Sequence, residues 1–208
     1  MILKKSVLKV FEFIFIIGIP LLFIAFVVYS MFNDELGISW IKLVSMWLLS
    51  FAIITFSTYL HEFGHKLRIK HYSKTSNPKI RMWGIKGVTH DDEYYKRFKN
   101  TIPSKSKELR DNLLAGVRFS MSIYSFIGVA LAFLMPFNFC GRVTLASMLI
   151  SIFLQVLNAS DIDQIINDTL YQTPKGQGKI EGLLWAFTCA SACTLCSMLI
   201  QVFYQASA

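Results

Sequence analysis

The strongest constraint on the fold is a series of apolar runs, each close to the length that crosses a bilayer. The 208-residue chain has five such runs, at 10–32, 40–60, 112–135, 143–159 and 182–204. A helix satisfies its own backbone hydrogen bonds, so it is the usual way for such a run to cross lipid. With 54% hydrophobic and 16% charged residues, the composition also favours a membrane protein. We therefore predict an all-α polytopic membrane protein with about five transmembrane helices.

The main polar segment, 66–111, separates the second and third runs. Within it, residues 79–89 alternate in part between apolar and polar side chains and contain Gly84 and Gly87. This pattern predicts a short β-hairpin. Because no repeat or linker divides the chain, we expect a single membrane-embedded domain over 1–208, with its core at 40–165.

Positive charge is concentrated in the same polar segment. It carries 13 Lys or Arg and 5 Asp or Glu, which accounts for the whole net charge of +8. Basic loops usually stay in the cytoplasm, so we expect the 66–111 loop and the N-terminus to lie there. We therefore expect the lipid bilayer, through its anionic headgroups, to be the partner of this basic loop. We exclude nucleic acid, because no motif that stacks on bases or enters a groove accompanies the charge.

The second run ends in a His-Glu-x-x-His pattern, residues 61–65. On a helix, His61 and His65 are about one turn apart and face the same side, so their imidazoles can bind one Zn²⁺. Glu62 follows His61 directly and can act as a general base toward a water molecule. A purely structural interpretation places these residues among the lipid headgroups. However, a glutamate beside histidines at membrane depth is costly without a function.

A hydrolytic zinc site needs a third protein ligand and one open position. The second and fourth runs are expected to cross in the same direction. Asp161 lies 18 residues after the start of the fourth run, and His61 lies 21 residues after the start of the second. The difference corresponds to about 4–5 Å along a helix, which predicts that Asp161 reaches the depth of the histidines. Asp163 and Asp168 remain alternative ligands, and Asp161 could instead cap a helix.

A His-Glu-x-x-His helix in a membrane span, followed by an Asp at the end of a later span, resembles the site-2 protease class of intramembrane zinc metallopeptidases. Within that class it is most similar to small bacterial zinc peptidases, over about residues 61–163. The resemblance implies that Glu62 activates water and that His61, His65 and Asp161 hold Zn²⁺. It also implies that the hairpin presents an unwound substrate. The expected protein is therefore a protease of membrane-anchored or small peptides in the bacterial cytoplasmic membrane.

Two other functions fit parts of the sequence. Family members often have a Pro after an Asn and then Leu-Asp-Gly, whereas this chain has Asn158-Ala-Ser-Asp161. This shorter stretch would suit a non-catalytic membrane adaptor that keeps a metal-like pocket. A metal transporter or sensor would place polar groups near the middle of several spans. The first, third and fifth runs offer little beyond Glu12 and Arg118, so we treat the adaptor as the main alternative to the protease.

Overall fold

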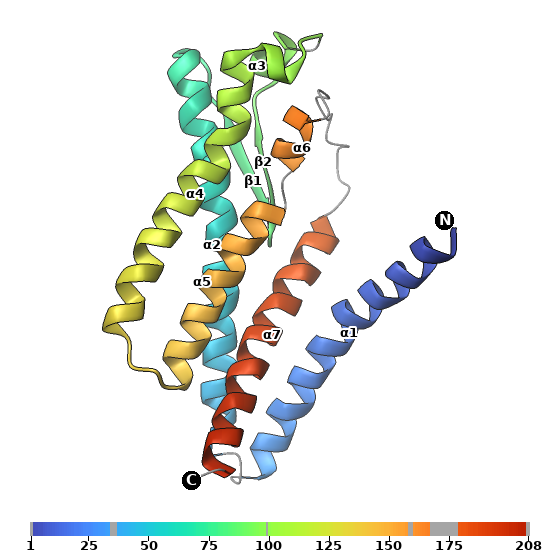
Figure 1. Ribbon diagram of the computed structural model, residues 1–208, viewed down its shortest axis with the longest axis vertical. Helices are drawn as coiled ribbons and strands as arrows, with labels where there is room; N and C mark the ends of the chain where they lie inside the picture. Colours follow the sequence, from blue (N-terminus) through green and yellow to red (C-terminus); the bar gives the residue numbers. More distant parts are fainter. Residues whose placement is uncertain (1, 34–36, 99, 158–159, 167–178, 207–208) are drawn as a thin grey trace.

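The computed structural model describes residues 2–33, 37–98, 100–157, 160–166 and 179–206. Its long helices run roughly along one axis, and a two-stranded sheet lies toward one end (Figure 1). In chain order the elements are α1 (Ile2–Phe32), α2 (Trp40–Tyr72), β1 (Lys79–Trp83), β2 (Lys86–His90), α3 (Asp92–Lys96), the 3₁₀ turn η2 (Pro103–Lys105), α4 (Lys107–Leu134), α5 (Phe139–Leu157), α6 (Ser160–Ile166) and α7 (Lys179–Ala206). The helical fold and the single hairpin are as predicted.

Four of the five predicted runs form helices that are long and apolar enough to cross a membrane. They are α2, α4, Ile14–Phe32 of α1 and Ile180–Phe203 of α7. The fourth predicted run corresponds to α5, whose apolar part, Phe139–Gln155, is shorter than the roughly 20 residues of a full span. Among the described residues, therefore, four candidate spans are found. The chain has the character of a membrane protein, and the fifth span stays a prediction.

The central helix is α2, which carries the histidine motif. It packs against α1, α4, α5 and α7 and against both strands. Its 33 residues correspond to about 50 Å, well beyond the ~30 Å hydrocarbon core of a bilayer. The helix begins after Ser39, whose side chain accepts a hydrogen bond from the Lys42 N–H. The last turns of α2 therefore extend past the apolar part of the bundle. The His-Glu-x-x-His motif, residues 61–65, lies at the start of these turns.

Small and polar side chains join α2 to α5. The Ser50 and Ser147 hydroxyls are hydrogen-bonded at 2.7 Å, and Gln155 donates to the Ser57 hydroxyl at 3.0 Å. All four residues are buried. Small side chains let helix backbones approach closely, and paired hydroxyls satisfy each other where water is absent. These contacts hold α5 beside the helix that bears the motif.

The hairpin is held by two different helices. β2 packs on α2, and the turn between the strands lies on the first turn of α7. Gly84 adopts a left-handed backbone conformation at this turn, with φ of +63°. The Ile85 N–H donates to the Gly182 carbonyl at 3.2 Å, and Lys86 pairs with Glu181 at 2.7 Å. The last helix of the chain thus fixes the strands against the motif.

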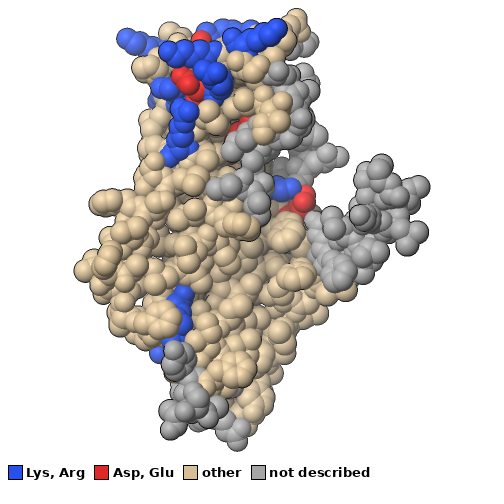
Figure 2. All heavy atoms as spheres, in the orientation of Figure 1, with Lys and Arg blue, Asp and Glu red and all other residues tan. Residues whose placement is uncertain are grey.

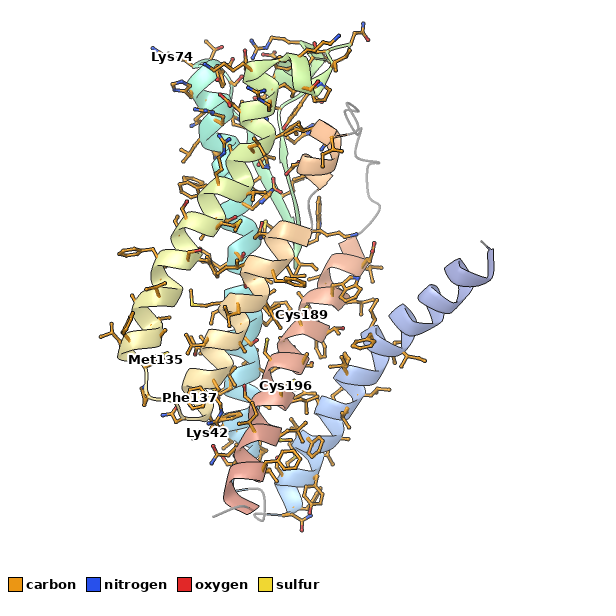
Figure 3. All side chains as sticks on the ribbon, in the orientation of Figure 1. Lys42, Lys74, Met135, Phe137, Cys189 and Cys196 are labelled. Carbon is orange, nitrogen blue, oxygen red and sulfur yellow. The ribbon has the colours of Figure 1, made fainter. Side chains whose placement is uncertain are left out.

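Basic side chains gather at one end of the molecule, over the end of α2, α3 and the start of α4 (Figure 2). Lys74 lies at this end, whereas Lys42 lies near the opposite end (Figure 3). Between them the surface is mostly uncharged (Figure 2). In the same view α1 descends from mid-height on the right to the opposite end, where α2 begins (Figure 1).

Candidate metal centre

His61 and His65 lie side by side on one face of α2. Their Nε2 atoms are 3.0 Å apart and both side chains are buried. Residues four apart on a helix project in nearly the same direction, which explains the close approach of the two rings. The rings face α4, so the Nε2 atoms of both histidines are directed into the interface between α2 and α4.

Asp161 closes the cluster from α6. Its Oδ2 atom lies 3.0 Å from the His61 Nε2 and 3.2 Å from the His65 Nε2. The other carboxylate oxygen, Oδ1, accepts a hydrogen bond from Gln164 Nε2 at 3.3 Å. The structure thus brings together the three residues that the sequence predicts as ligands, from positions about 100 apart in the chain. Asp163 also lies in α6, but its side chain is outside the described residues, as is Asp168.

The geometry of the three donor atoms fits zinc. Ligands of a tetrahedral zinc ion, at about 2.0–2.1 Å from the metal, lie about 3.3 Å from one another. The three separations here are 3.0, 3.0 and 3.2 Å. Nitrogen and carboxylate oxygen are ligands that zinc accepts readily, and a three-residue set leaves one position open.

A backbone carbonyl of α4 orients one of the imidazoles. His65 Nδ1 donates to the Asn112 carbonyl at 2.8 Å. A histidine whose Nδ1 carries the proton presents the lone pair of Nε2, which is the form that binds a metal. The contact therefore fixes both the tautomer and the ring position of His65. His61 Nδ1 is buried and has no hydrogen-bond partner among the described residues.

Two glycines make room for the cluster between α2 and α4. A Cβ atom on Gly116 would lie 2.6 Å from the Nε2 atoms of both His61 and His65. A Cβ on Gly64 would lie 2.6 Å from the Ala115 carbonyl oxygen. Both distances are shorter than real Cβ contacts. Gly64 therefore lets the backbones of α2 and α4 approach closely, and Gly116 leaves room for the two imidazoles.

Glu62 is held by the hairpin rather than by α4. The Thr89 hydroxyl of β2 lies 2.9 Å from the Glu62 Oε2 and 2.7 Å from the Glu62 backbone oxygen, so its single proton is shared between two acceptors. Gly87 also lies against this side chain, since a Cβ there would be 2.6 Å from the Glu62 Cγ. The carboxylate is therefore buried between α2 and β2 in a defined position.

A tyrosine of α3 completes the surroundings of the cluster. The Asn112 side-chain amide donates to the Tyr95 hydroxyl at 3.2 Å. Burial raises the pKa of Tyr95, so its hydroxyl stays protonated over the physiological range. Thr89, Asn112 and Tyr95 were not among the residues predicted from the sequence. Asn112 contacts His65, Thr89 contacts Glu62, and Tyr95 contacts Asn112. These contacts depend on the register of the hairpin and the rotation of α4, which no local pattern shows.

The chain matches no protein-family model, no curated protein and no solved structure.

Proposed function

We propose that the protein is an intramembrane zinc metalloprotease that hydrolyses peptide bonds of membrane-anchored or small peptide substrates. The observation that supports it best is the convergence of His61, His65 and Asp161. Glu62 directly follows His61 in the sequence and is positioned by a different element, strand β2. When bound at such a site, zinc acts as a Lewis acid that makes water nucleophilic near neutral pH.

In this proposal Glu62 moves the proton. Its carboxylate accepts a proton from the attacking water as the new carbon–oxygen bond forms. It then delivers that proton to the amine nitrogen as the carbon–nitrogen bond breaks. The Thr89 hydroxyl holds one carboxylate oxygen, which fixes the direction of the other. Thr89 is thus a positioning residue that acts through Glu62.

The substrate has to be extended at the bond that is cut. In a membrane helix the carbonyl groups are already hydrogen-bonded within the helix, so a helical substrate must first unwind. The hairpin is a two-stranded sheet, and within the described chain neither strand pairs with a third. An extended peptide can add to such an edge through main-chain hydrogen bonds. This supports a role for β1 and β2 in holding substrate near Glu62.

We also propose that the protein lies in a bacterial cytoplasmic membrane with its N-terminus in the cytoplasm. The basic end formed by α3 and the adjoining ends of α2 and α4 supports this orientation, because such segments are retained on the cytoplasmic side. Reporter fusions at residue 74 and at the C-terminus test it. The first is expected to report a cytoplasmic location and the second an external one, and the reverse pattern would contradict the orientation.

The experiment that tests the activity compares wild type with Glu62→Gln in liposomes that contain a single-span peptide labelled with a fluorophore and a quencher. We expect the variant to lose about 100-fold or more in cleavage rate while it keeps its zinc, because the ligands remain and only the general base is lost. Glu93→Gln is the control, since Glu93 is exposed and lies outside the cluster. Equal cleavage by wild type and Glu62→Gln would refute the mechanism, whereas no cleavage and no bound zinc in wild type would favour the adaptor.

A further inference from the structure

A second polar feature lies between α2 and α4, beside the metal-ligand cluster but separate from it. A pocket of about 370 Å³ is lined there by Arg68 and His71 of α2 and by Asp111 and Arg118 of α4. Its volume is within the range of pockets that hold small ligands. None of its four polar residues takes part in the proposed chemistry.

The charges in this pocket are not balanced. The Asp111 carboxylate already has two partners, because Arg68 Nη2 and the Tyr72 hydroxyl each lie 3.1 Å from its Oδ2. The Arg68 Nε is buried and has no acceptor among the described residues. Arg118 is exposed and forms no ion pair with any residue that the structure places. The Arg118 guanidinium is therefore available, within the described structure, for charge-assisted hydrogen bonds to an anion.

The pocket lies at the level of lipid headgroups. Arg118 is 16 residues before Leu134, the last residue of α4, or about 24 Å along the helix. If α4 crosses a hydrocarbon core of about 30 Å from Leu134, Arg118 is near the opposite boundary and Asp111 is beyond it. Leu67 and Phe119 give the same pocket apolar walls. Cationic donors beside apolar walls at this depth match the chemistry of a phospholipid, whose phosphate adjoins its acyl chains.

We propose that this pocket binds a phosphate group, with the Arg118 guanidinium as its main donor. The source is either the headgroup of an anionic phospholipid or free inorganic phosphate. Gly64 and Ala115 line the pocket. Gly64 directly precedes His65 of the cluster, and Ala115 directly precedes Gly116, which borders both imidazoles, so the bound group lies close behind the metal-ligand residues. The inference needs neither zinc nor peptidase activity.

The experiment is native mass spectrometry of the full chain in a neutral detergent, titrated with phosphatidylglycerol, with phosphatidylcholine and with inorganic phosphate. We expect wild type to bind phosphatidylglycerol more tightly than phosphatidylcholine. Arg118→Gln should weaken phosphatidylglycerol binding about fivefold or more, the amount that one basic residue contributes near an anionic lipid. The matched control is Arg110→Gln, an exposed arginine on the same helix that does not line the pocket. It should weaken binding less than about twofold.

Further outcomes of the titrations show whether the phosphate group comes from a phospholipid or from free phosphate, or they contradict the proposed binding site. Inorganic phosphate that displaces phosphatidylglycerol from wild type, and binds Arg118→Gln more weakly, would support the site with free phosphate as its ligand. Arg118→Lys keeps a charge and should retain most lipid binding, which guards against a folding defect in Arg118→Gln. Equal affinities in wild type and Arg118→Gln would overturn the proposal. Equal losses in Arg118→Gln and Arg110→Gln would also overturn it, because they would mean a diffuse charge effect.

Discussion

Two interfaces of α2 use small residues in different ways. Against α5, Ser50 and Ser147 bring the helices together and their hydroxyls satisfy each other. Against α4, Gly64 lets the backbones approach closely, and Gly116 leaves a space that holds two imidazole nitrogens close to a carboxylate oxygen. When both polar groups of a contact are hydrogen-bonded to each other, as in the serine pair, the contact stabilises helix packing. When several lone pairs converge on one point, a bound cation satisfies them best. Small residues alone therefore do not mark a functional site, and the groups that they make room for do.

The largest effect that we predict comes from filling the space between α2 and α4. Gly116→Ala would place a methyl group 2.6 Å from both Nε2 atoms and so force the ligands apart. We expect zinc affinity to fall about 100-fold or more, measured by competition with a chromophoric chelator. Gly128→Ala is the matched control on the same helix, because its added Cβ meets no atom within 4 Å. Equal zinc affinities in the two variants would show that the α4 interface does not shape the site.

An intermediate effect is expected where the hairpin holds the general base. Thr89→Val removes the hydroxyl next to the Glu62 Oε2 and leaves a buried carboxylate oxygen without this donor. We expect the cleavage rate to fall about tenfold with unchanged zinc content, because the ligands are untouched. Thr89→Ser keeps the hydroxyl and should restore most of the rate. A Thr89→Val protein that cleaves like wild type, or one that loses zinc, would contradict this role.

The smallest effect is expected at the interface with α5. Ser147→Ala removes the hydrogen bond to Ser50 and should lower the free energy of unfolding by about 1 kcal/mol without changing zinc affinity. Ser122→Ala is the control, since the exposed Ser122 hydroxyl bonds only within its own helix, to the Arg118 carbonyl. Its effect should stay below about 0.5 kcal/mol in the same detergent unfolding titration. A loss of zinc in Ser147→Ala would remove the distinction between the two interfaces.

Much of the fold and the cluster could be predicted because it depends on spacing along single helices. His61 and His65 are four residues apart, so a helix alone brings them together, and Asp161 was predicted from the lengths of two apolar runs. The hairpin was predicted from its glycines and partial alternation. These features follow from local geometry and from the thickness of a bilayer.

The rest depends on how separate elements meet, which the sequence does not show. The hydrogen bond from His65 to the Asn112 carbonyl requires a particular rotation of α4, and a backbone atom leaves no trace in side-chain patterns. The contact of Thr89 with Glu62 requires the register of β2 against α2. The predicted apolar runs leave out residues 160–166, which form α6, the short helix that carries Asp161. A helix this short has little periodicity from which to be predicted.

The central claim is that one divalent ion is held by two imidazoles of α2 and one carboxylate of α6. Elemental analysis of purified wild type, Asp161→Ala and Asp163→Ala tests it most directly. The structure predicts about one zinc per chain in wild type and in Asp163→Ala, and little zinc in Asp161→Ala. Zinc that remains in Asp161→Ala at the wild-type level, or that is absent from wild type purified without chelators, would contradict the claim.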